Sequence, residues 1–149
     1  MRLDIAVTLP RDARSVGVIR SVVTDALLRL GVAPECAEDI RLAISEACAN
    51  AVEHAHAADE YQVEIHVVDG TCAISVMNAG GGFDGIDLTG VMPDATSTRG
   101  RGVAIMTAVM DAVDLSSSPD GGTAVRLTRD LAFHQAGAPP AVELRSVPR

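Results

Sequence analysis

The dipeptide Asp69-Gly70 fixes antiparallel pairing in this chain, because it stands between two segments that both show the alternation of a strand. Residues Tyr61 to Val68 alternate and are rich in β-branched side chains, and Cys72 to Met77 supply the partner segment. An Asp-Gly pair between two such segments indicates a tight hairpin, since both residues tolerate a positive φ. We therefore expect a sheet with antiparallel strands.

Helical and strand patterns surround this hairpin. Apolar residues spaced by three and four predict two consecutive helices before it, and the second helix has a proline at its start. The expected elements are a first strand around Leu3, Ile5 and Val7, a helix from Arg11 to Leu30 that stops at Gly31, a helix from Pro34 to about His56, a long loop from Asn78 to Gly100, a helix from Gly102 to Ala112, and strands at Leu115 to Ser117 and Thr123 to Thr128.

This order of elements predicts an α+β fold. Hairpins demand antiparallel pairing, and the helices need one apolar sheet face to cover, so we expect a two-layer sandwich with helices on one face of a mixed, mostly antiparallel sheet. Residues 1–132 are expected to form one domain. Residues 133–149, which are rich in Ala, Gly and Pro, are expected to form a flexible C-terminal tail.

Charge and composition exclude several functions. All 12 basic residues are Arg and none is Lys, so a Walker A lysine, a kinase-type strand lysine and a Schiff-base lysine are all excluded. The net charge of −8 argues against nucleic acid and against anionic membranes as partners. Aromatic residues make up only 2 %, so the core must be aliphatic.

The three cysteines and the first residues indicate a cytoplasmic protein. Cys36, Cys48 and Cys72 are odd in number and lack CxxC spacing, which favours neither a disulfide framework nor a zinc site. An alternating pattern follows Arg2 where a signal peptide would have an apolar run, and no segment has the length of a membrane span.

Glu46 and Asn50 are the first candidate site residues. Four residues apart in the second expected helix, they lie on one helical face. Such a pair is most often part of a solvated polar face. The functional alternative is a general base beside an amide oxygen that suits Mg²⁺.

Three glycine-containing segments follow. Asn78 to Asp84 is glycine-rich and comes directly after a strand, Arg99-Gly100-Arg101-Gly102 precedes Val103 at the start of a helix, and Gly121-Gly122-Thr123 enters the last strand. Plain turns and a flexible basic loop explain each segment taken alone. A helix start with free N–H groups and arginines is also a site for phosphate.

Taken together and in this order, the segments resemble the motifs of the GHKL superfamily of ATPases. Glu46 to Ala55 resembles the N box, Asn78 to Phe83 resembles the D-x-G-x-G-F box, Arg99 to Met106 resembles the second glycine box, and Gly122-Thr123 resembles the closing G-T. The short chain is most similar to the RsbW/SpoIIAB-type anti-sigma-factor serine kinases. The resemblance covers residues 3 to 132 and implies a Bergerat-type fold.

The resemblance also implies roles, partners and cofactors. It makes Glu46 the general base and Asn50 the Mg²⁺ ligand, and it implies a STAS-domain antagonist, a sigma factor and a homodimer. The residues that it assigns to ATP binding are Asn50, Asn78, Gly80, Gly82, Phe83, Arg99, Gly100, Arg101, Gly102, Val103 and Thr123.

Asn78 departs from the family pattern, which has an aspartate that accepts a hydrogen bond from the adenine amino group. Loss of the charged acceptor costs about 1–3 kcal/mol, so we expect weaker ATP binding rather than none. An ATP-dependent binding module without catalysis is the alternative that Asn78 favours. A fragment of a sensor histidine kinase is a third interpretation.

Overall fold

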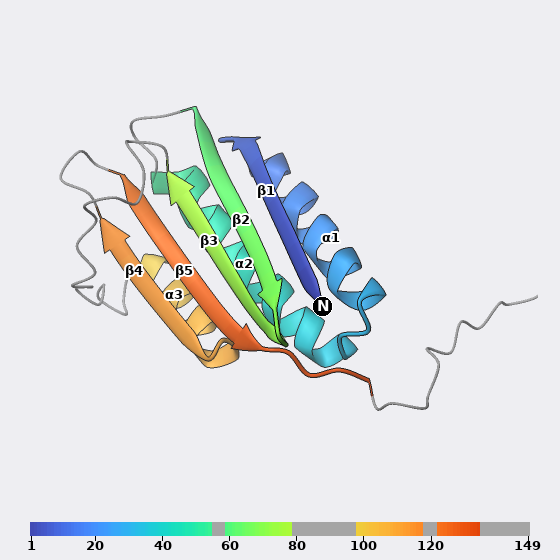
Figure 1. Cartoon of the computed structure of the whole chain (residues 1–149). Coiled ribbons are helices and arrows are strands. Elements are labelled where there is room, and N and C mark those ends of the chain that lie inside the picture. Colours follow the sequence, from blue (N-terminus) through green and yellow to red (C-terminus); the bar gives the residue numbers. More distant parts are fainter. Residues whose placement is uncertain (55–58, 79–97, 118–121, 135–149) are drawn as a thin grey trace, which may run out of the picture.

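The computed structural model describes residues 1–54, 59–78, 98–117 and 122–134. In these residues, five strands and three helices follow one another in the order expected from the sequence (Figure 1). They are β1 (Arg2–Pro10), α1 (Ala13–Arg29), α2 (Pro34–His54), β2 (Glu60–Val68), β3 (Thr71–Asn78), α3 (Thr98–Val109), β4 (Ala112–Ser117) and β5 (Thr123–Asp130).

The five described strands form one sheet in the order β1-β2-β3-β5-β4. Every described pairing is antiparallel, so the mixed sheet expected from the sequence reduces to an antiparallel one in this part of the chain. The physical reason is the position of β5. The strands β3 and β4 are connected through α3 and run in the same direction, but β5 lies between them, so they do not pair.

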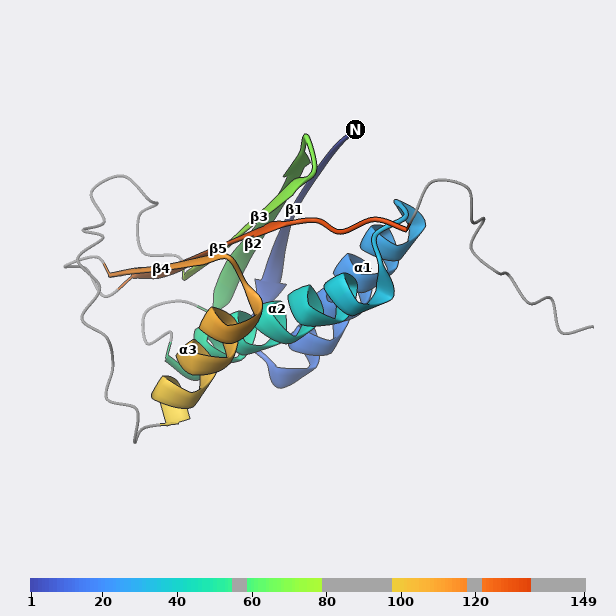
Figure 2. The same ribbon diagram turned by 90° about the horizontal axis from the view of Figure 1, so that it is seen from below.

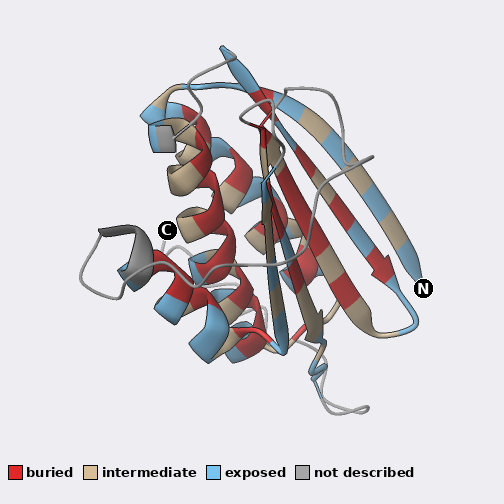
Figure 3. Cartoon of the chain, turned by 90° about the vertical axis from the view of Figure 1, so that its left-hand side faces the viewer, coloured by how far each residue is buried: buried red, intermediate tan, exposed pale blue. Residues whose placement is uncertain are grey.

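The sheet and the helices form two layers. All three helices cover the same face of the sheet (Figure 2), and the buried sides of the sheet and helices face one another (Figure 3). The two-layer α+β fold is therefore confirmed. None of the described helices is long and apolar enough to span a membrane.

Local sequence sets the ends of α1 and the first hairpin. The Asp12 carboxylate accepts the backbone N–H of Arg14 at 2.9 Å and caps α1, while Gly31, with φ of 87°, follows its last turn. Asp69 and Gly70 both have positive φ, at 50° and 80°, as the predicted tight turn requires.

The boundaries of α3 and β4 differ from those expected. The helix begins at Thr98 and ends at Val109, and Ala112, expected at the helix end, already belongs to β4. Hydrogen bonds to β5 account for the early strand: Asp111 donates its N–H to the Thr128 carbonyl at 2.9 Å. Pairing with a neighbouring strand therefore outweighs the local helical pattern here.

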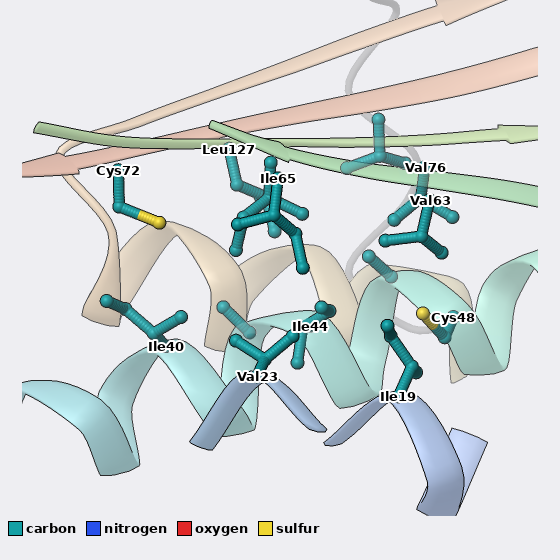
Figure 4. Packing of buried hydrophobic residues seen from close by; sticks show 14 of the residues in the cluster. Ile19, Val23, Ile40, Ile44, Cys48, Val63, Ile65, Cys72, Val76 and Leu127 are labelled. Carbon is teal, nitrogen blue, oxygen red and sulfur yellow. The ribbon is translucent and has the colours of Figure 1, made fainter. Parts of the chain in front are cut away.

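The core between the layers is aliphatic, as the composition predicts. Side chains of α1, α2 and the inner face of the sheet interdigitate in it (Figure 4); the labelled members are Ile19, Val23, Ile40, Ile44, Cys48, Val63, Ile65, Cys72, Val76 and Leu127. Tyr61 is the one tyrosine of the chain and is fully buried, with its hydroxyl 2.6 Å from Ser15 Oγ. Burial raises the pKa of Tyr61 to about 12.

The chain beyond β5 is tied to the connection between α1 and α2. Phe133 pairs with Val32 in an isolated antiparallel bridge, and His134 donates its N–H to the Gly31 carbonyl at 3.0 Å. These two residues belong to the segment expected to be a tail. The rest of that segment, residues 135–149, lies outside the described residues.

Candidate active site

Glu46 and Asn50 meet the first turns of α3. Both side chains are half-buried, and they lie one helical turn apart in α2. A β-carbon added to Gly102 would lie 3.0 Å from Glu46 Oε2 and 3.6 Å from both Asn50 amide atoms. The carboxylate and the amide thus share one helical face, as predicted, and the absence of a side chain at Gly102 lets α3 approach them.

The position of α2 places this pair near one end of the sheet. In Figure 4, Ile40 lies beneath Cys72, close to the start of β3, whereas Cys48 lies toward Val76, close to its end. The helix therefore runs in the direction of β3. Its C-terminal half, which carries the carboxylate and the amide, lies at the end where β3 stops and β5 begins.

Asn78 and Thr123 occupy that end of the sheet on neighbouring strands. Asn78 is the last residue of β3 and Thr123 the first of β5. Asn78 Nδ2 donates to Thr123 Oγ1 at 2.7 Å, and the asparagine is only 8 % exposed. Asn78 Oδ1 is buried and has no hydrogen-bond partner in the described part of the chain. An unpaired buried acceptor is costly, so this oxygen is a natural point for a ligand donor.

The start of α3 changes the location of the expected phosphate site. Sequence patterns put the first helical N–H groups at Gly102, but the helix begins four residues earlier, at Thr98. The first four N–H groups of a helix lack intrahelical partners. The free groups and the positive end of the helix dipole therefore belong to residues 98–101. Gly102, by contrast, acts through its close approach to α2.

The remaining candidates fall into three groups. Arg101 is exposed beside the helix start, whereas the Val103 side chain packs in the core and leaves only its backbone for a ligand. The structure describes the backbone of Arg99 and Gly100 in α3 but not their side-chain surroundings. The other three candidates, which lie outside the described residues, are Gly80, Gly82 and Phe83.

Arg129 helps to hold the elements of the site together, and the sequence motifs did not reveal it. Its guanidinium lies 2.7 Å from Asp39 Oδ2 of α2 and also donates to the Val109 carbonyl at the end of α3. Burial is the largest single influence and lowers the pKa of Arg129, but the hydrogen bond to Asp39 and the nearby negative charges together outweigh it and raise that pKa. This contact ties α2, α3 and β5 together. The strand alternation at Val125 and Leu127 places Arg129 on the inner face, and that signal could have identified it.

The buried thiols are poor candidates for chemistry. Desolvation raises the pKa of both Cys48 and Cys72 to about 12, so neither forms a thiolate at neutral pH. The half-buried carboxylate of Glu46 is better placed to exchange a proton with a substrate.

Comparison with known proteins defines the class to which this fold and site belong. The model of the histidine kinase-like ATPase domain matches residues 9–129, so the chain belongs to this family. Within the family it is similar to the serine-protein kinase RsbW. It is 31 % identical to that of Bacillus pumilus over 140 residues and 33 % identical to that of Bacillus licheniformis over 133 residues. The first match covers 85 % of this chain and 85 % of the relative, and the second covers 82 % of each.

Solved structures share the fold. The RsbU and RsbW domains of Rv1364c from Mycobacterium tuberculosis match with a TM-score of 0.66 and 25 % identity, over 87 % of this chain and 32 % of that chain. The SiaB-SiaC complex from Pseudomonas aeruginosa matches with a TM-score of 0.57 and 15 % identity, over 86 % of this chain and 89 % of that chain. The second likeness concerns the fold alone.

Proposed function

We propose that this chain is an ATP-dependent protein kinase that phosphorylates a serine or threonine hydroxyl of a small partner protein. The observation that carries the proposal is the close approach of Gly102 in α3 to Glu46 and Asn50, at the end of the sheet where Asn78 is buried. The similarity to serine-protein kinase RsbW supports the same reaction class.

The donors and acceptors at the site fit a magnesium-bound nucleotide. The unpaired Asn78 Oδ1 matches the hydrogen-bond donor that an adenine amino group supplies. The amide oxygen of Asn50 suits Mg²⁺, which prefers oxygen ligands. When bound, Mg²⁺ offsets the negative charge of the phosphates.

Each residue then has a distinct role. Glu46 accepts the proton of the attacking hydroxyl, because a carboxylate within reach of that group is a competent general base. The free N–H groups at the start of α3, with Arg99 and Arg101, hold phosphate oxygens. Phosphoryl transfer depends mostly on positioning and electrostatics, which this arrangement provides.

The proposal extends to partners. A STAS-domain antagonist is the proposed phosphate acceptor, and a sigma factor is the proposed partner that the kinase sequesters. We further propose a homodimer in the cytoplasm. These assignments rest on the resemblance to anti-sigma-factor kinases and on the similarity to RsbW.

Glu46→Gln tests the proposed base directly. The substitution keeps the size of the side chain and removes its basicity, so we expect phosphotransfer to fall by about 100-fold or more while ATP still binds. The assay follows the transfer of labelled phosphate to a STAS-domain substrate, with ATP affinity measured separately. Glu35→Gln is the matched control, since Glu35 is exposed in the first turn of the same helix. Full activity of Glu46→Gln would show that the base is assigned incorrectly.

Asn78 favours a second candidate function, an ATP-dependent binding module without catalysis. In that case ATP binding changes the affinity for a partner, but no label reaches it. Incubation with labelled ATP and the partner separates the two functions, because label transfer occurs only with the kinase.

A further inference from the structure

The pairing of Asn78 with Thr123 leaves one end of a buried amide unused. The nitrogen of the amide is engaged with Thr123 Oγ1 at 2.7 Å, and the oxygen has no partner in the described part of the chain. The asparagine is more than nine-tenths buried, and an unpaired acceptor in such a place is costly. The site therefore calls for a donor from a ligand.

An amide differs from a carboxylate because its two ends are chemically different, and a half-turn of the side chain exchanges the positions of the oxygen and the nitrogen. A carboxylate only accepts hydrogen bonds, whereas an asparagine has an acceptor on one side and two donors on the other, and a threonine hydroxyl can donate or accept. After a half-turn of the amide, Thr123 would donate to Oδ1 and Nδ2 would face the ligand. Both orientations keep the contact between Asn78 and Thr123.

We propose that Asn78 and Thr123 form a reversible amide pair that accepts both 6-amino and 6-oxo purine nucleoside triphosphates. The present orientation offers an acceptor, which suits the amino group of ATP. The turned orientation offers a donor, which suits a 6-oxo group. A carboxylate at this position presents two acceptors and repels an oxo group, and such unmatched polar contacts are the basis of strong discrimination. The inference rests on the proposed nucleotide site but not on catalysis.

Inosine triphosphate is the probe that isolates this contact, because it differs from ATP only at position 6 and in the proton on N1. We expect the dissociation constants of the native protein for ATP and inosine triphosphate, measured by calorimetry with Mg²⁺, to agree within about fivefold. Asn78→Asp should raise the constant for inosine triphosphate, relative to that for ATP, by about tenfold or more.

Removal of the Thr123 hydroxyl completes the experiment. Thr123→Val leaves one end of the amide unpaired in either orientation, so both nucleotides should bind about tenfold more weakly. Urea unfolding establishes that each variant folds. If Asn78→Asp does not fold, the ratio of the native protein's dissociation constants for ATP and inosine triphosphate tests the inference.

The possible outcomes separate this inference from the proposed function. Native discrimination against inosine triphosphate as strong as that of Asn78→Asp overturns the inference and leaves the kinase proposal standing. Equal binding of both nucleotides without phosphotransfer supports the inference and overturns the kinase proposal. Binding of neither nucleotide overturns both.

Discussion

We expect the replacement of Gly102 with alanine to lower the rate of phosphotransfer without lowering the stability of the fold. The new β-carbon would lie 3.0 Å from Glu46 Oε2, which is 0.4 Å short of the 3.4 Å at which ordinary van der Waals contact begins. Because the carboxylate is the far end of a flexible side chain, it can move away at small energetic cost. The backbone of α3 therefore keeps its place, and Glu46 is the group that shifts.

Two opposing magnitudes follow from this geometry. Alanine inside a helix is favoured over glycine by about 0.5–1 kcal/mol, so the free energy of unfolding should stay unchanged or rise slightly. A misplacement of about 1 Å at a reacting group can cost a factor of about 100. For the smaller shift at Glu46 we expect the rate of phosphotransfer to fall by about tenfold.

Urea unfolding and a phosphotransfer assay measure the two effects. Gly17→Ala in α1 is the matched control, since its added β-carbon meets, among the described residues, only Arg20 Nη2, at an ordinary 3.8 Å. That control should gain stability and keep full activity. A Gly102→Ala protein with the native rate of transfer would refute the link between α3 and the position of Glu46.

Two further predictions concern the charged pairs. Asp39→Asn removes the charged partner of the partly buried Arg129 and should lower the free energy of unfolding by about 1 kcal/mol, whereas Asp25→Asn, in an exposed pair, should change it by less than about 0.5 kcal/mol in urea unfolding. The hydrogen bond that His66 donates to the Asp4 carboxylate raises the pKa of His66 and lowers the pKa of Asp4. The histidine contribution to stability is lost as pH rises through its folded pKa, and the aspartate contribution is lost as pH falls through its folded pKa, so the pair stabilises most between the two unfolded values. An NMR titration should show a lower His66 pKa in Asp4→Asn, and an unchanged value would contradict the pairing.

Much of the fold could be predicted because its local signals agree with its tertiary contacts. The turn at Asp69-Gly70 and the stop at Gly31 have the positive φ values that their sequences favour. The early start of β4 could not be predicted, because Ala112 continues a helical pattern and only pairing with Thr128 makes it a strand. Local patterns do not contain that long-range pairing.

The candidate site also has features that the sequence predicts and features that it does not. Helical spacing alone places Glu46 and Asn50 on one face. Their contact with Gly102 depends on how α3 packs on α2, and the partner of Asn78 depends on which strand lies beside β3. Such facts come from the arrangement of the elements in space.

Tyr61 gives this protein a single tyrosine chromophore, buried at a defined place. With no tryptophan and one tyrosine in the chain, the near-ultraviolet absorption at tyrosine wavelengths comes from one ring, whose hydroxyl reaches Ser15 where α1 meets the sheet. Tyrosine emission therefore reports the docking of α1 without any label. It offers a direct view of one helix that complements the whole-chain signal of circular dichroism.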